Sequence, residues 1–143
     1  MQLVLCDPAS RCERASAAVQ FAGTLLFNLS TGAAVWAHAV TAERRYVWAP
    51  DATGSIAFLL SGALGMVAVA AGVGLFALRS RDWQVGAINL IGCVAFGVSA
   101  VAAFVRVSGI TADALLANLG TFIGALCFLA AALMGLPGAP RPG

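Results

Sequence analysis

Four long stretches of apolar residues alternate along the chain with short segments that hold the charged side chains. Each stretch can form an α-helix that crosses about 30 Å of hydrocarbon, which takes about 20 residues. No Asp, Glu, Lys or Arg lies in the central part of any stretch. We therefore predict an all-α integral membrane protein with four transmembrane helices in an antiparallel bundle. The predicted segments are a polar leading segment (1–16), a transmembrane domain (17–136) with helices at about 17–40, 54–78, 85–105 and 114–136, and a proline-rich tail (137–143).

The first stretch has an alternative interpretation as a cleaved signal peptide. Its end, Ala37-His38-Ala39, has the small-x-small form of a cleavage site. A signal peptide has an apolar region of about 7–15 residues, whereas this stretch is longer and contains the polar residues Asn28 and Ser30. We therefore favour a retained helix.

A short pattern recurs once in each stretch: a Gly, then a small residue, usually a Phe four positions after the Gly, and a Ser or Cys at seven. The copies are Gly23-Thr24…Phe27…Ser30, Gly54-Ser55…Phe58…Ser61, Gly92-Cys93…Phe96…Ser99 and Gly120-Thr121…Gly124…Cys127. Steps of four and seven fall on one face of a helix, and small residues let helices approach closely in lipid. The pattern predicts a bundle of similar helix repeats. The predicted packing residues are Gly23, Ser30, Gly54, Ser55, Phe58, Ser61, Gly92, Phe96, Ser99, Gly120 and Thr121.

Composition supports a membrane location and argues against several other classes. Apolar residues make up 61% of the chain and charged residues 10%, against about 25% charged in soluble domains. The lipid bilayer is therefore the first expected partner. The net charge of +2 and the absence of basic runs argue against nucleic-acid binding. Four cysteines without a close pair and a single His argue against a metal site, and we expect no cofactor.

The charged and aromatic residues between the stretches indicate an orientation. Trp48, Asp51 and Trp83 are expected at the membrane–water interface, where amphipathic rings are enriched. The side of the membrane that holds both termini carries more arginine (Arg11, Arg14, Arg79, Arg81 and Arg141) than the other side (Arg44, Arg45 and Arg106). The positive-inside rule then predicts that both termini lie in the cytoplasm. We expect a multi-pass protein of the cell membrane, specifically a bacterial inner membrane.

Three asparagines inside the stretches are the strongest polar candidates. Asn28, Asn89 and Asn118 could form hydrogen bonds between helices, which is the common role of such residues. Alternatively, they could converge on one axis and line a polar pore. The spacing leaves both interpretations open. His38, near the end of the first stretch, is expected at the interface, with a proton-sensing role as the alternative.

Two resemblances to known families follow from these motifs. The segment from Trp48 to Ser61 (WAPDATGSIAFLLS), followed by Asn89…Gly92…Phe96 and Asn118…Gly120-Thr121, resembles YrhK-like membrane proteins. That resemblance implies a small helical membrane module without an established activity. Gly23-Thr24-Leu25-Leu26-Phe27-Asn28 is also similar to a segment of bacterial fluoride channels, which implies that Asn28 lines an ion path.

These observations predict a function without catalysis. No nucleophile lies beside a base, no carboxylate pair shares a helix face within the stretches, and no Gly-rich loop follows a strand. We expect that the protein is not an enzyme but a structural or interaction module of the membrane, with a small passive ion channel as the alternative. Thin helices rich in Gly and Ala also favour a homo-oligomer or a membrane-protein partner.

Overall fold

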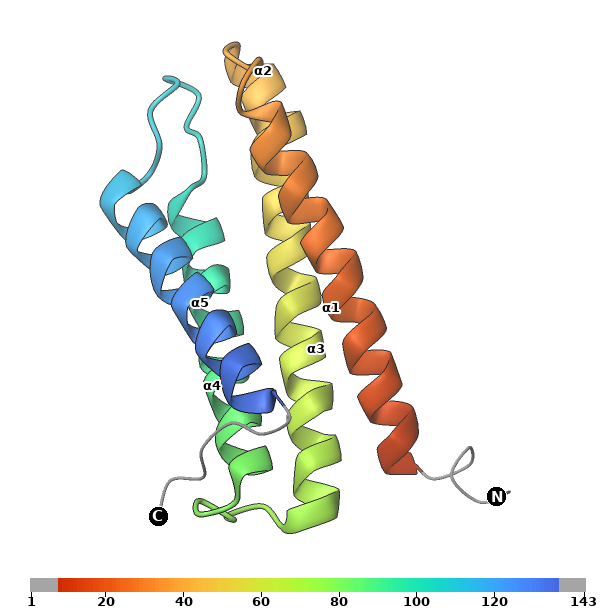
Figure 1. Ribbon diagram of the computed structural model, residues 1–143. Helices are drawn as coiled ribbons and strands as arrows, with labels where there is room; N and C mark the ends of the chain where they lie inside the picture. The colour runs from red at the N-terminus through yellow and green to blue at the C-terminus, as the bar shows by residue number, and fades with distance from the viewer. Residues whose placement is uncertain (1–7, 137–143) are drawn as a thin grey trace.

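The computed structural model describes residues 8–136, which form helices and connecting loops with one isolated β-bridge between Val105 and Thr111. The helices are α1 (Pro8–Ala33), α2 (Val40–Ala42), the π-helix η1 (Glu43–Trp48), α3 (Ala49–Val73), α4 (Arg81–Ala102) and α5 (Ala114–Gly135). The four long helices run alternately up and down, so that the start of α1 and the end of α5 lie at the same end of the molecule (Figure 1). The predicted tail, 137–143, lies outside the described residues.

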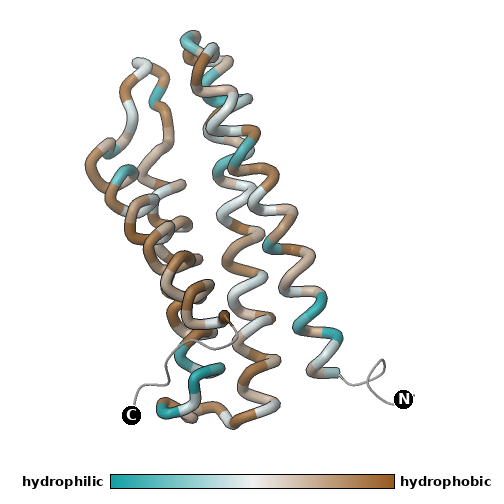
Figure 2. Tube along the Cα trace, in the orientation of Figure 1, coloured by the Kyte–Doolittle hydropathy of each residue, from teal (hydrophilic) through white to brown (hydrophobic). Residues whose placement is uncertain are grey.

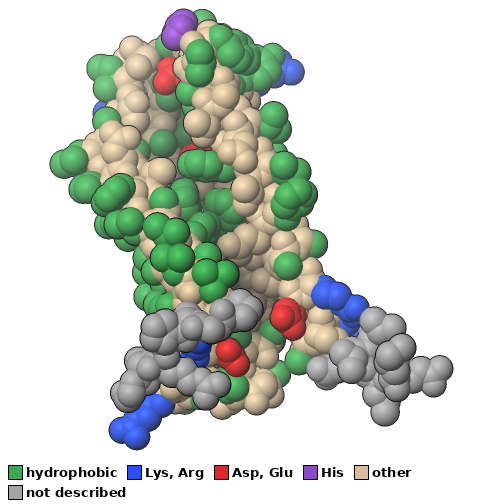
Figure 3. Space-filling view, in the orientation of Figure 1, with side chains coloured by type: hydrophobic (Ala, Val, Ile, Leu, Met, Phe, Trp, Pro, Cys, Tyr) green, Lys and Arg blue, Asp and Glu red, His purple; other side chains and the backbone are tan. Residues whose placement is uncertain are grey.

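Three helices within the described range are long and apolar enough to cross a membrane: Val40–Val73, Arg81–Ala102 and Ala114–Gly135. The fourth long helix, α1, is not among them, and it carries more hydrophilic positions along its length than α5 does (Figure 2). Hydrophobic side chains cover much of the visible surface between the two ends, and charged side chains gather toward the ends (Figure 3). The protein is therefore an all-helical protein suited to a membrane.

The helix boundaries differ from the predicted ones at several points. Residues 8–16, predicted as part of a polar leading segment, are helical, and α1 ends at Ala33 rather than at residue 40. The second stretch ends at Val73 rather than at 78 because Gly74 has φ +98°, a conformation that favours glycine and stops the helix. α4 covers 81–102 instead of 85–105, since its first turn includes charged residues that the apolar pattern left out.

The segment between the first two predicted spans, residues 41–53, is helical rather than a loop. A π-helical segment precedes α3, and the Ala49 N–H bonds to the carbonyl oxygen of Arg44, five residues back. Pro50 follows directly; it lacks an N–H, and in a regular α-helix its ring would clash with the carbonyl four residues earlier. The π-helical turns therefore end directly before the proline, at the place where it would disrupt a regular α-helix.

Two side chains attach this π-helical segment to α4 and to the residues that follow α4. Arg44 Nε donates to the Val105 carbonyl oxygen at 2.6 Å, and Trp48 Nε1 donates to the Ala100 carbonyl oxygen at 2.9 Å. The Trp48 ring also packs against Phe104, with ring centroids 5.0 Å apart. Trp48, predicted at the interface, is thus engaged with another helix.

The start of α5 agrees with the prediction and has a sequence signal. Asp113 caps the helix, and its carboxylate accepts from the Leu116 N–H at 2.9 Å. α1 packs along α3, and α4 packs along α5, while α3 joins the two pairs by packing on α4. The molecule is therefore two helical hairpins placed side by side. Buried Phe58, Cys93 and Phe96 form the core at their junction.

Candidate functional site

The crossing of α1 and α3 depends on two glycines that bring the backbones into contact. A methyl group on Gly23 would lie 2.9 Å from the Phe58 ring and 3.0 Å from the Gly54 carbonyl oxygen. In the other direction, a methyl group on Gly54 would lie 3.0 Å from the Gly23 carbonyl oxygen. These distances are at or below the shortest that real Cβ atoms show, so a larger residue at either position would force its neighbours to shift.

The crossing of α4 and α5 has the same construction. A methyl group on Gly124 would lie 2.6 Å from the Phe96 ring and 3.1 Å from the Gly92 carbonyl oxygen. One on Gly92 would lie 2.8 Å from the Phe128 ring. Each crossing therefore pairs two glycines and places a phenylalanine ring of one helix over a glycine of the other.

A buried serine lies one to two turns from each crossing and forms matching hydrogen bonds. In the first pair, Ser61 Oγ is 2.8 Å from both the Ser16 carbonyl oxygen and Gln20 Oε1. In the second, Ser99 Oγ is 2.7 Å from both the Ala117 carbonyl oxygen and Thr121 Oγ1. Both serines thus bind a backbone carbonyl and a side chain of the neighbouring helix.

These contacts relate the two hairpins by an approximate two-fold exchange. The residue numbers of every matched pair from α3 and α4 differ by the same amount. The residue numbers of every matched pair from α1 and α5 also differ by one fixed amount. The corresponding pairs are Gly54 and Gly92, Phe58 and Phe96, Ser61 and Ser99, Gly23 and Gly124, Phe27 and Phe128, Ser16 and Ala117, and Gln20 and Thr121. Corresponding helices run in opposite directions, so this approximate two-fold symmetry interchanges the two ends of the bundle (Figure 1).

The exchange corrects the register of the fourth copy of the repeat. The sequence pattern reads that copy as Gly120…Gly124…Cys127, whereas the structure matches Gly124, Phe128 and Ala131 to the other copies. Ala131, at position seven, is 5% exposed, while Cys127 is only half-buried. The phenylalanine four positions after the glycine marks the correct register.

Other predicted packing residues also lie between helices. A methyl group on Gly120 would lie 2.8 Å from the Ser99 Cβ, so Gly120 approaches α4 as closely as the crossing glycines. Ser30 and Ser55 are buried, at 5% and 2% exposure. Ser55 Oγ has no hydrogen-bond partner in the described part of the chain. The exchange pairs Ser55 with Cys93, which is fully buried.

Four phenylalanine rings form a cluster where the hairpins meet. Phe27 of α1 contacts Phe96 of α4 edge to face at 5.3 Å, and Phe128 of α5 contacts Phe58 of α3 edge to face at 5.2 Å. Phe58 and Phe96 contact each other at 5.3 Å, and Phe96 also contacts Phe128 at 5.2 Å. We call these four residues the Phe cluster. Its two outer contacts obey the exchange, and Phe58 and Phe96 exchange with each other.

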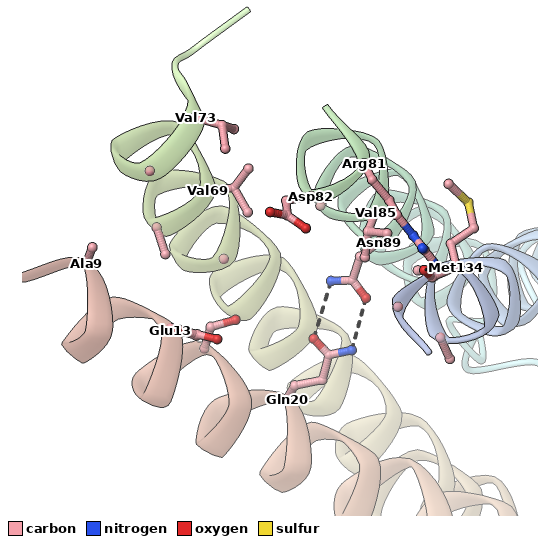
Figure 4. A pocket seen from close by; sticks show the side chains of 18 of the residues that line it. Ala9, Glu13, Gln20, Val69, Val73, Arg81, Asp82, Val85, Asn89 and Met134 are labelled. Carbon is pink, nitrogen blue, oxygen red and sulfur yellow. Dashed lines mark hydrogen bonds between the residues drawn. The ribbon is translucent and has the colours of Figure 1, made fainter. Parts of the chain in front are cut away.

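A cavity of about 980 Å³ lies between the Phe cluster and the end of the bundle where α1 starts and α5 ends. All four long helices line it. Gln20 and Asn89 meet in it through a reciprocal pair of amide hydrogen bonds of 3.2 and 3.4 Å (Figure 4). Glu13 and Asp82 approach the same space from α1 and α4 (Figure 4). Arg81 bonds instead to carbonyl oxygens at the end of α5. The cavity therefore combines an amide pair with two carboxylates.

A smaller cavity of about 460 Å³ lies on the opposite side of the Phe cluster, near η1 and the start of α5. Its lining includes Asp51 and Asn118, and also Trp48. Asp51, predicted at the interface, is in the first turn of α3 and faces this cavity. Trp83, the third predicted interfacial residue, is half-buried and donates to the Leu75 carbonyl oxygen at 2.9 Å.

The three asparagines lie apart in the described part of the chain, and they do not share one lining there. Asn89 lies in the larger cavity, and Asn118 lines the smaller one. Asn28 lines neither; it is exposed on α1, directly after Phe27 of the Phe cluster. The sequence reasoning missed Gln20, which joins Ser61 to Asn89, because a lone glutamine in an apolar stretch gives no signal of its partners.

His38 is exposed in the connection between α1 and α2. Among residues 8–136, no group of three His, Cys, Asp or Glu side chains is placed to hold a metal ion. A comparison of the chain with protein-family models, curated proteins and solved structures finds no match in any of the three.

Proposed function

We propose that the protein is a multi-pass module of the cell membrane with a structural or interaction role and no catalytic activity. In this proposal α1 also spans the bilayer, which gives four transmembrane helices in an antiparallel bundle of the YrhK-like kind. Both termini then face the cytoplasm. The resemblance of the repeat segments and the bias of the arginines support these two points.

The close contact of α1 with α3 supports the fourth span. α3 belongs to one of the three helices apolar enough to cross a membrane. α1 lies against it with backbone contact at Gly23 and Gly54, and Phe27 reaches into the Phe cluster. A helix held in that position shares the depth of its neighbour. Gln20, one of the residues that make α1 more polar, is already satisfied inside the bundle by Ser61 and Asn89.

The single observation that carries the proposal is the use of the polar and small residues in contacts between helices. The glycines touch backbone or rings, the serines at 61 and 99 bond across the pairs, and the Phe cluster fills the space between the cavities. In lipid, such contacts are the main source of helix association. The chain therefore resembles a rigid packing unit more than a catalyst.

Replacement of a crossing glycine by leucine tests this proposal. Gly124→Leu is expected to abolish the folded state in mild detergent, because its side chain would overlap the Phe96 ring. Gly72→Leu is the matched control, since nothing lies within 4 Å of a methyl group there. Equal unfolding curves for Gly124→Leu and the wild type would overturn the proposal of a packing unit.

A passive channel is the second candidate, and one observation favours it: two cavities approach the same Phe cluster from opposite ends. The cluster would then be the closed constriction. Efflux of fluoride, chloride and potassium from proteoliposomes tests this candidate. A selective wild-type flux above that of empty liposomes would support the channel, with Phe96→Ala expected to raise it. Tight wild-type liposomes that contain folded protein would leave the structural or interaction role.

A further inference from the structure

The exposed face of α1 differs from that of α5, although the exchange makes the two faces correspond. On α5 the face consists of Phe122, Leu126, Leu129 and Leu133, which are 61%, 48%, 55% and 54% exposed. Such a face suits lipid chains. The corresponding residues on α1 are Phe21, Leu25, Asn28 and Gly32. The first two agree with α5, whereas an amide and a bare glycine replace the last two leucines.

Asn28 lacks the hydrogen bonds that its polar neighbours on α1 form. The Thr24 hydroxyl donates to the Gln20 carbonyl oxygen at 3.0 Å, and the Thr31 hydroxyl donates to the Phe27 carbonyl oxygen at 2.9 Å. Asn28 forms no side-chain hydrogen bond within residues 8–136 and is exposed. Phe27 before it and Ser30 after it both line the smaller cavity, so Asn28 lies at the level of that cavity but on the outer side of α1. With α1 as the proposed membrane span, an unpaired amide on this outer face meets hydrocarbon, which is costly.

We infer that the α1 face of Phe21, Leu25, Asn28 and Gly32 binds the same face of a second copy of this chain, with a reciprocal amide pair between the two Asn28 side chains. A primary amide has a donor and an acceptor, so two copies related by a two-fold axis satisfy each other. Gln20 and Asn89 already form such a pair inside one chain, at 3.2 and 3.4 Å.

The neighbours of Asn28 permit the required approach. Gly32 lies one turn further along α1 and has nothing within 4 Å of the place where a methyl group would stand. Thr24, one turn before, has its hydroxyl bonded to its own helix. Copies inserted in the same orientation bring their α1 helices together in parallel, so that both Asn28 residues lie at the same depth. The two-fold axis then runs along the membrane normal.

This inference rests on the proposed interaction role and on α1 as a membrane span. Cysteine cross-linking in proteoliposomes tests the contact face. In a background without the native cysteines, Gly32→Cys is expected to form a disulfide-linked dimer under mild oxidation. Leu133→Cys is the matched control, because it occupies the corresponding position on α5, and it is expected to stay monomeric. A dimer from Leu133→Cys but not from Gly32→Cys would overturn the inference.

Single-molecule photobleaching of labelled protein at decreasing density in liposomes tests the amide pair. Asn28→Leu is expected to weaken dimerisation about tenfold, since polar pairs contribute modestly to helix association in lipid. Asn118→Leu is the control, because it removes an exposed asparagine from α5 and should leave the dimer unchanged. A monomeric wild type at every density, or an Asn28→Leu variant that dimerises like the wild type, would overturn the inference.

Failure of self-association is distinguishable from failure of the proposed function. If the wild type is monomeric but folded, and Gly124→Leu unfolds, the packing unit stands and only the identity of its partner is wrong. If Gly124→Leu folds like the wild type, the proposed function fails whatever the oligomeric state. A thermal melt of every variant shows whether a lost dimer reflects a lost contact or a misfolded chain.

Discussion

The α1–α3 and α4–α5 hairpins form matching contacts between their helices but carry different side chains on their exposed faces. Inside, both have a glycine–glycine crossing, a ring over each crossing and a serine that binds the neighbouring backbone. Outside, α5 presents Leu129 and Leu133 where α1 presents Asn28 and Gly32. Equivalent interiors indicate that the crossing is what a stable hairpin requires. The difference outside is the observation on which the inferred contact between two copies rests.

The Phe cluster shows where the exchange between the hairpins holds least well. Phe96 contacts three other rings, whereas Phe58, its counterpart, contacts two, because Phe96 contacts both Phe27 and Phe128. The cluster is therefore centred on α4. Replacement of Phe96 and of its counterpart Phe58 by alanine should therefore lower the stability by unequal amounts.

The largest expected effect is that of Phe96→Ala. Loss of a buried ring that touches three others should lower the free energy of unfolding by about 3–5 kcal/mol, the range for large cavities. Phe58→Ala, which removes the counterpart ring with two aromatic neighbours, should cost less. Unfolding by SDS titration in mixed micelles measures both. Equal losses would show that the cluster is symmetric in energy despite its unequal contacts.

The next effect is that of a single methyl group at a crossing. Gly124→Ala should destabilise by about 1–3 kcal/mol, because the added carbon would lie 2.6 Å from the Phe96 ring and the packed ring must shift. Gly23→Ala, at 2.9 Å from the Phe58 ring, should cost somewhat less. The same titration tests the order, with Gly72→Ala as the control. A larger loss for Gly23→Ala would reverse the ranking of the two crossings.

A smaller effect is expected at the two buried serines. Ser99→Ala leaves both the Ala117 carbonyl and the Thr121 hydroxyl without this partner, and should cost about 1 kcal/mol. Ser61→Ala should cost less, because Gln20 keeps its amide pair with Asn89. Thermal melts of both variants in one detergent compare them. If Ser61→Ala is the more harmful, the Gln20–Asn89 pair depends on the serine.

The sequence predicted the long helices and the glycine-and-phenylalanine pattern because apolar length and helical spacing are local properties. It gave the wrong register for the fourth copy, since Gly120-Thr121 resembles Gly23-Thr24 more than Gly124 does. The exchange itself could not be predicted from the sequence. It pairs helices that run in opposite directions, and the pairing depends on which helices contact each other in the fold.

The candidate site was harder to predict than the helices. The three asparagines share a residue type but occupy three environments, and only the packing of α1 on α3 decides that Asn28 points outward. The helical linker was missed because Pro50 and three charged residues, Glu43, Arg44 and Arg45, are typical of a loop. Long-range bonds from Arg44 to Val105 and from Trp48 to Ala100 of α4 hold that segment in place.

The smallest expected effect lies at Ser55, the counterpart of Cys93. Its hydroxyl is buried without a hydrogen-bond partner among residues 8–136, whereas a thiol at the same place in α4 needs none. Ser55→Ala removes an unsatisfied polar group, so stability should stay within about 0.5 kcal/mol of the wild type or rise slightly. SDS titration, with Ser99→Ala alongside, measures the contrast. A loss as large as that of Ser99→Ala would mean that Ser55 forms a bond in the membrane, and the two hairpins would then differ inside as well as outside.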